Sequence, residues 1–269
     1  MRRDPVVAGQ FYPGDRGKWE AEVRRYLAQG APEGGKKAKL AMVPHAGYMF
    51  SGKIAGKTLA GADLEETVLL LGPNHTGKGD ALAVWPDGEW VLPGAKLSVA
   101  SELAKRLLNA HSALSKSYAA HTYEHSLEVV IPFLWAINPN TRILPLAIAE
   151  PSFDLLQEVG KSLAEQLKSE QEPVSIVVSS DMSHFVSQTK AKTQVDKAIQ
   201  AIKELDPKLL YTVVREEGIT MCGVLPMTLG LVIAKELGAQ KAELVEYGTS
   251  ADTTGDYEKV VGYAGMLVY

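Results

Sequence analysis

Short runs of Val, Ile, Leu and Met alternate along this chain with longer segments in which apolar residues recur every three or four positions. The short runs predict buried strands at residues 39–43, 67–71, 142–149, 174–179, 242–248 and 259–268. The longer segments predict helices at residues 15–29, 53–61, 99–109, 126–137, 153–168, 190–204 and 223–237. Strands that alternate with helices in this way predict an α/β protein with a central parallel or mixed sheet.

The size of the chain and its turn residues limit how this sheet is organised. A chain of 269 residues, 46% of them hydrophobic, can bury a full core, and we expect one domain covering residues 1–269. The Gly/Pro/Lys-rich stretch 30–37 is too short for a domain linker and predicts a loop. Runs 81–85 and 90–92 flank Pro86-Asp87-Gly88 and predict a hairpin. The last run is apolar nearly throughout, which predicts a strand inside the sheet.

Charge and hydropathy argue against two classes of partner. A net charge of −4 and a pI near 5.9 offer no basic surface for nucleic acid or for an anionic membrane. The longest apolar runs are too short to span a bilayer, and no signal-type apolar segment follows the first residues. The single cysteine excludes an internal disulfide and suits a reducing compartment. We therefore expect a cytoplasmic protein.

Histidines and one aspartate follow three of the predicted strands. His45 comes directly after the strand at 39–43, His75 follows the strand at 67–71, and Asp181 with His184 follows the strand at 174–179. In open α/β sheets the ligand crevice lies at the carboxyl ends of the strands. Turn-forming residues at each position would hold the side chains at fixed angles. The sequence therefore predicts that these polar groups meet at one edge of the sheet.

Cys222 stands at the start of the helix predicted at 223–237. The free amides and the dipole of a helix start lower the pKa of a thiol and favour thiolate. Such a thiolate would complete a three-ligand set with His45 and His75, and three protein ligands with one open position are typical of a catalytic metal site. This mixed set suits zinc, iron or copper, and affinity alone does not choose among them.

Each of these residues also has a simpler interpretation. A lone cysteine is usually a buried apolar side chain, His45 or His75 can be a histidine satisfied by backbone carbonyls, and Asn74 can cap a turn. Asp181 can cap a helix by accepting a bond from the amide of His184. His121-Thr122-Tyr123-Glu124-His125 matches the pattern of a zinc metallopeptidase, with His121 and His125 as ligands and Glu124 as base. Since His121 lies in a Ser/Tyr/Ala-rich stretch before the helix, we expect it in a surface loop and rank the peptidase low.

Five motifs in fixed order carry a family resemblance. They are PHAGY at 44–48, LGPNH at 71–75, EHSLE at 124–128 followed by IPF, SSDMSH at 179–184 and MCG at 221–223. The set resembles the Memo family, whose prokaryotic members are often termed AmmeMemoRadiSam system protein B, and it extends from Ala8 to Gly265. That family is similar in fold to the class III extradiol dioxygenases, which are non-haem iron enzymes. The resemblance thus implies a three-layer α/β sandwich with a mostly parallel or mixed central sheet.

The resemblance also implies roles for residues of this chain. It implies a metal site of His45, His75 and Cys222, with Asp181 and His184 beside it. By position His184 resembles the acid/base of the dioxygenases, and Asp181 would orient it or fix its tautomer through a hydrogen bond. His125 would contact the substrate, and Tyr48 and Asn74, which lie in the same motifs, are further candidates for such contacts.

Two departures from related proteins affect what the resemblance can carry over. The third ligand is a thiolate where the dioxygenases use a carboxylate, and sulfur changes which metals bind and can itself be oxidised. Val224 and Leu225 follow Cys222-Gly223 where many relatives have a basic residue. Ring-opening activity and an anionic-substrate contact at that point therefore do not follow from the resemblance.

Two classes of function follow from the sequence. In the first, the protein is a non-haem redox enzyme with iron(II) or copper, or else zinc, that acts on a small molecule, for which aromatic compounds are candidates. In the second, the same cleft binds a peptide or partner protein without turnover. The family's prokaryotic name suggests a radical-SAM protein as partner. This chain has a single cysteine and cannot hold the partner's iron–sulfur cluster, so that protein would be a separate polypeptide.

Overall fold

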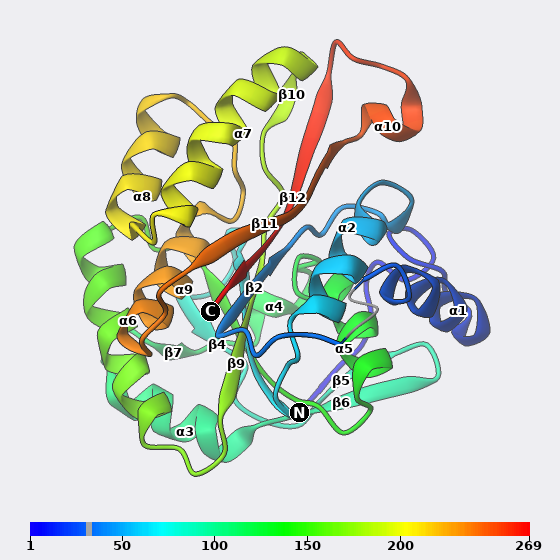
Figure 1. Cartoon of the computed structure of the whole chain (residues 1–269). Helices are drawn as coiled ribbons and strands as arrows, with labels where there is room; N and C mark the ends of the chain where they lie inside the picture. The colour runs from blue at the N-terminus through cyan, green and yellow to red at the C-terminus, as the bar shows by residue number, and fades with distance from the viewer. Residues whose placement is uncertain (31–33) are drawn as a thin grey trace.

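The computed structural model describes residues 1–30 and 34–269 (Figure 1). Residues 31–33 of the loop predicted at 30–37 lie outside the described part. A continuous mixed sheet has the strand order β1-β5-β6-β8-β3-β9-β2-β12-β10, with β11 also paired to β12, and β4 to β8 and β7. Its strands are β1 Arg2–Arg3, β2 Leu40–Val43, β3 Thr67–Pro73, β4 Leu82–Val84, β5 Glu89–Leu92, β6 Ala95–Val99, β7 Ser115–Lys116, β8 Arg142–Ile148, β9 Val174–Ser179, β10 His184–Val186, β11 Ala242–Thr249 and β12 Val260–Val268.

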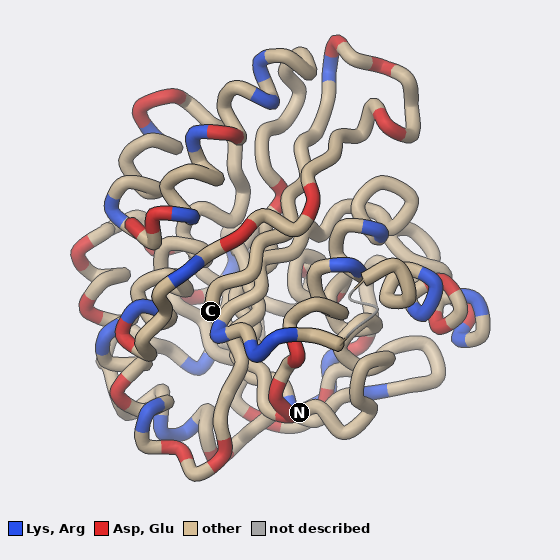
Figure 2. Tube along the Cα trace, viewed as in Figure 1, with Lys and Arg blue, Asp and Glu red and all other residues tan. Residues whose placement is uncertain are grey.

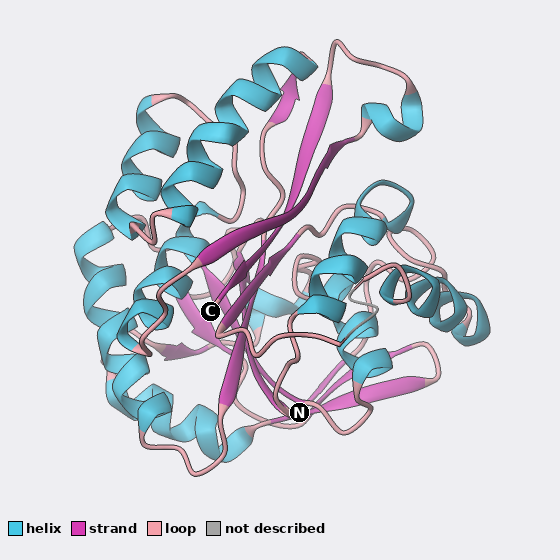
Figure 3. Cartoon of the chain, in the orientation of Figure 1, coloured by secondary structure: helices cyan, strands magenta, loops and turns pink. Residues whose placement is uncertain are grey.

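Helices cover both faces of this sheet (Figure 3). On one side lie α3 Ser101–Ala110, α6 Phe153–Lys168, α7 Gln188–Lys203, α8 Pro207–Glu216 and α9 Val224–Glu236. On the other lie α1 Arg16–Leu27, α2 Tyr48–Gly61 and α5 Ile131–Ile137. Three short helical segments, α4 Ala119–Thr122, η1 Glu128–Val130 and α10 Ala251–Thr254, complete the described chain. The predicted α/β fold with a central, mostly parallel sheet flanked by helices is confirmed.

The two faces of the sheet divide the apolar residues between two cores. In β2, Leu40 and Met42 pack into the core beneath α6 and α9, whereas Ala41 and Val43 pack into the core beneath α2. Successive side chains of a strand point to opposite faces, so a strand buried on both faces must be apolar throughout. This requirement explains why β2 and most of β3 appear in the sequence as apolar runs. Outer helix faces carry ion pairs instead, such as Arg24–Glu20 on α1, and Figure 2 shows Lys and Arg interspersed with Asp and Glu there.

Parallel pairing brings the carboxyl ends of three strands to one edge. β9 pairs in parallel with both β2 and β3, so that Val43 lies opposite Ser179 and Leu71 lies opposite Val178. Chain segments that leave β2, β3 and β9 therefore start side by side. The strand at the end of the chain, β12, lies between β2 and β11, as its apolar sequence predicts.

Some predicted elements are wrong. The hairpin expected from 81–85 and 90–92 is not formed, because β4 pairs with β8 and β7, and the hairpin joins β5 to β6. The helix predicted at 126–137 begins with a turn and η1 before α5. Helix α8 was not predicted, although Asp206 caps it and Pro207 occupies its first turn. In the described part of the chain, no helix combines the length and apolar character that crossing a bilayer requires.

Candidate metal centre

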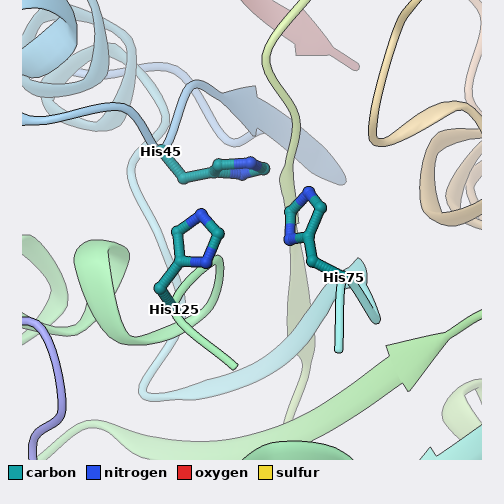
Figure 4. Close-up of side chains that lie close together, drawn as sticks. All are labelled: His45, His75 and His125. Carbon is teal, nitrogen blue, oxygen red and sulfur yellow. The ribbon is translucent and has the colours of Figure 1, made fainter. Parts of the chain in front are cut away.

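Three histidine side chains converge at the carboxyl edge of the sheet. His45 follows β2, His75 follows β3, and His125 lies in the turn before η1. One ring nitrogen of each lies within 4.8 Å of the other two, and Figure 4 shows the rings turned toward one another. The rings of His75 and His125 stack at a centroid distance of 4.8 Å, and the ring of His45 stands nearly perpendicular to both. Three imidazoles so arranged could hold a metal ion of unspecified identity.

The hydrogen bonds of His45 fix its tautomer. Ser179 Oγ donates its one proton to the carbonyl of Ser126 at 2.7 Å. His45 Nδ1 lies 2.7 Å from the same Oγ, so the imidazole must be the donor there. In neutral His45 the proton thus sits on Nδ1, and Nε2 presents its lone pair to the site. Burial lowers the pKa of His45 well below 6.5, and the nearby charges of His125 and His75 act in the same direction, so the ring is neutral at pH 7.

Glu124 fixes His75 in the same way. Its fully buried carboxylate accepts bonds from His75 Nδ1 at 2.8 Å, from the amide of His75 at 2.5 Å and from the amide of Ser126 at 2.9 Å. Burial alone would raise the pKa of Glu124, but the hydrogen bond and charge of His75 outweigh it and hold that pKa at about 2. An ionised carboxylate only accepts, so His75 Nδ1 carries the proton and Nε2 is free. A carboxylate behind a ligating histidine is a common feature of metal sites.

The turn that carries His125 is tied to the same strand ends. Ser126 Oγ donates to the carbonyl of Pro73 at the end of β3, and the Ser126 carbonyl accepts from Ser179 at the end of β9. Gly72 makes this approach possible, because a Cβ there would lie 2.4 Å from Leu127 Cδ2. From the sequence, His125 was expected to contact substrate or, in the peptidase pattern, to bind zinc together with His121. Its presence in the three-histidine group depends on this turn, whose anchoring bonds join residues far apart in the chain.

Cys222 lies beside His45 and outside the three-histidine group. Its Sγ is 3.3 Å from His45 Nε2 and accepts a bond from the amide of Asp181 at 3.2 Å. The expected lowering of its thiol pKa is wrong for the metal-free protein. Burial raises the pKa of Cys222 well above its ordinary value, and the charge of Asp181 adds to this effect. Gly223 allows the position, since a Cβ there would lie 2.3 Å from Ser180 Cβ.

Asp181 and His184 occupy neighbouring positions, but the hydrogen bond that we expected between them is not formed. Asp181 Oδ1 accepts from the amide of His45 at 2.8 Å, and burial raises the pKa of this carboxyl to about 6. The amide of His184 donates to Thr220 Oγ1, so Asp181 does not cap a helix there. His184 Nδ1 lies 2.8 Å from the Thr220 carbonyl, which only accepts, and in neutral His184 Nε2 therefore bears the lone pair. Thr220, which the sequence did not single out, holds this ring.

The two further candidates for substrate contact have structural partners. Tyr48 is buried, and its hydroxyl donates to the carbonyl of Val129 while its ring packs against Phe133. Asn74 accepts bonds from Thr76 and from the amide of residue 77, and it donates to the carbonyl of residue 78, so it closes the turn that follows His75. Their contact with a substrate stays a prediction.

His121 is fully buried, and the expectation of a surface loop is wrong. Its Nε2 lies 2.8 Å from the Ala83 carbonyl, and its ring packs against both Trp85 and Trp90. Helix α4 ends at Thr122, so the two histidines and the glutamate of the peptidase pattern do not share one helix. The Glu124 carboxylate accepts hydrogen bonds from His75 instead of serving as a free base. The zinc peptidase interpretation therefore loses its geometric basis.

Comparison with known proteins gives one family. The model of the Memo-like protein family matches residues 3–267. A MEMO1 family protein of Aquifex aeolicus (strain VF5) is 40% identical over 266 residues and is matched over 98% of both chains. Others come from Methanococcoides burtonii, 39% identical, and Methanopyrus kandleri, 36% identical, each matched over 99% of both chains.

A solved structure is similar in fold. The crystal structure of the Escherichia coli K12 protein JW3007, described there as uncharacterized, superposes with a TM-score of 0.58. The match covers 86% of this chain and 99% of that one, at 13% sequence identity. At this identity the likeness concerns the fold alone.

Proposed function

Since this chain belongs to the Memo-like protein family, we propose that it binds a transition metal which serves a redox reaction on a small molecule. The observation that carries this proposal is the convergence of His45, His75 and His125, two of them held with the proton on Nδ1 and the lone pair on Nε2. In this proposal His45 and His75 are two of the three ligands. His125 or Cys222 supplies the third.

The donor set fits such an ion. Imidazole suits iron, copper and zinc, and a thiolate adds preference for softer ions. The three ring nitrogens lie within 4.8 Å of one another, so small side-chain rotations would let them hold one ion. We expect iron(II) or copper, with zinc as the alternative, because zinc does not change its oxidation state. When bound, the ion would supply an electrophilic, redox-active centre.

The exposure of the ligands favours a reactive site over a structural one. His45 is buried, whereas the side chains of His75 and His125 keep 33% and 27% of their surface exposed. Solvent and small molecules therefore have access from one side. Structural sites are closed by four protein ligands, and catalytic sites keep one position open.

Within this proposal His184 is the base that takes a proton from the substrate. The lone pair on its Nε2, which the bond from Nδ1 to Thr220 leaves free, would accept a proton from a substrate hydroxyl. Asp181 would position His45, because its carboxylate accepts a hydrogen bond from the His45 amide. The proposed fold relationship is the three-layer sandwich of the class III extradiol dioxygenases. The proposed substrate is a small hydroxylated molecule, with aromatic compounds as the first candidates.

Metal reconstitution tests the ligands. Metal-free protein would be incubated anaerobically with iron(II), copper(I) or zinc(II), desalted and analysed for metal. We expect equimolar metal in the wild type and little in His45→Ala and His75→Ala. His125→Ala and Cys222→Ala decide which of the two side chains supplies the third ligand. His111→Ala is the matched control, since His111 lies at the end of α3 and bonds the amide of Ala113. Equal metal in all variants would contradict the proposal.

Oxygen consumption tests the reaction class. The reconstituted protein would be mixed with a panel of catechols in an oxygen electrode. Uptake that requires both metal and His184 would support the redox enzyme. If metal binds but no compound is consumed, a ligand-binding role without turnover takes its place.

A further inference from the structure

The N-terminal arm, residues 2–14, is fastened to the segment that carries two groups of the metal centre. This segment, residues 121–128, contains His125 and also Glu124, which holds His75. Arg3 is buried, and it donates from Nε to the carbonyl of His121 at 2.9 Å and from Nη2 to the carbonyl of Glu124 at 2.6 Å. One side chain of the arm thus binds the backbone on the near side of His125.

Glu128 holds the far side of the same segment. Its buried carboxylate pairs with Arg3 Nη1 at 2.8 Å. It also accepts bonds from the amides of Val6 and Val7 and from the hydroxyl of Tyr12. All of these donors belong to the arm. Because a buried charge is costly unless it is paired and hydrogen-bonded, the arm and residue 128 depend on each other for their positions.

The arm also touches one histidine of the centre directly. The ring centroid of Phe11 lies 5.0 Å from that of His125, and the Phe11 carbonyl accepts from the amide of Tyr48 at the start of α2. Contacts of the arm therefore lie on three sides of His125. Arg3 bonds to the backbone before it, arm residues bond to Glu128 after it, and Phe11 packs against its ring.

We propose that Arg3 and Glu128 are positioning residues of the metal centre, which fix the ring of His125 and, through Glu124, that of His75. This inference rests on the proposed metal site. Its consequence is a thermodynamic coupling between the arm and the metal, because a group that helps to bind the ion is in turn held by it. An arm with a purely structural role would not respond to the ion.

Hydrogen exchange in the wild-type protein tests the coupling without any substitution. The amides of Val6 and Val7, which donate to Glu128, would be followed with and without saturating zinc(II). We expect exchange at least about tenfold slower with zinc, as binding that requires a closed arm predicts. The amide of Leu209, which donates to Asp206 at the cap of α8, is the internal reference and should change less. Equal slowing at all three amides, or none at Val6 and Val7, would overturn the inference.

Conservative variants give a second measurement. Arg3→Lys and Glu128→Gln should weaken zinc(II) binding by about tenfold or more, the effect typical of residues that support metal ligands. Arg2→Lys is the matched control, because Arg2 is the exposed neighbour and pairs with exposed Asp4. Unchanged affinity in folded Arg3→Lys and Glu128→Gln would overturn the inference while the metal site stands. If a variant does not fold, the exchange result decides. Absence of zinc binding in the wild type would overturn both proposals.

Discussion

Substituting Glu124 by glutamine should make His75 a poorer metal ligand, because the Glu124 carboxylate holds the His75 ring with its proton on Nδ1. Three donors meet the Glu124 carboxylate: His75 Nδ1, the His75 amide and the Ser126 amide. Glutamine replaces one acceptor oxygen by an NH2 group that donates. If that group faces the His75 amide, two donors oppose each other. If it faces His75 Nδ1, the ring must carry its proton on Nε2, the atom proposed to bind the metal.

The size of the effect follows from these contacts. A buried donor left without a partner costs about 1–3 kcal/mol, so unfolding should become easier by that amount. For metal binding, loss of a supporting carboxylate weakens affinity by about 10–100-fold. At about 1.4 kcal/mol for each factor of ten, this corresponds to about 1.4–2.8 kcal/mol. The loss of stability and the loss of metal affinity have the same cause but are measured separately.

A competition titration of zinc(II) against a chromophoric chelator measures the affinity. The matched control is Glu65→Gln, because Glu65 precedes β3 at the opposite end from His75 and pairs with exposed Lys37. Circular dichroism would verify that both variants are folded. An affinity of folded Glu124→Gln within twofold of the wild type would refute the tautomer argument.

Three other perturbations have defined outcomes. Burial lowers the pKa of His121 to about 4 from 6.5, so the unfolded chain binds the proton first as the pH falls. Urea unfolding of the metal-free protein should therefore show about 2 kcal/mol less stability at pH 5 than at pH 7 from this residue, and His121→Gln should lose less; equal losses would refute it. Phe185 is exposed and has a φ of 57°, a backbone conformation that asparagine adopts more easily, so Phe185→Asn should raise the free energy of unfolding by about 1 kcal/mol. Asp63, which also has a positive φ, is the control, and Asp63→Asn should bring no gain. A decrease for Phe185→Asn would contradict the expected relief of strain. Gly223→Ala should destabilise by about 1–3 kcal/mol through contact with Ser180, and an unchanged thermal midpoint would show that the contact relaxes freely.

The fold was predictable from sequence where local pattern and burial agree. Strands β2, β3 and β9 are buried on both faces, so each is a mostly apolar run that leads into a turn. Their parallel pairing then brings His45, His75 and Asp181 to one edge, as expected from strand ends alone. Pairing between strands distant in the chain was not predictable in this way. The turn residues after run 81–85 indicated a local hairpin, whereas β4 pairs with β8 about sixty positions later.

The candidate site was predictable as a location but less so in its chemistry. A helix start favours thiolate, which led to the expectation for Cys222, but burial outweighs it in the folded chain. His121 and His125 looked alike in one motif, and packing separates them: Trp85 and Trp90 enclose the first, and a turn anchored to two strands presents the second. Such differences depend on contacts with remote residues, which a motif does not contain.

The central claim is that His45 and His75 bind one metal ion through Nε2. Anomalous diffraction from crystals of the reconstituted protein, recorded on both sides of the metal absorption edge, tests it most directly. We expect one peak about 2.0–2.2 Å from His45 Nε2 and from His75 Nε2, with His125 or Cys222 completing the set. A peak bound elsewhere, or one coordinated through Nδ1 of either ring, would contradict it.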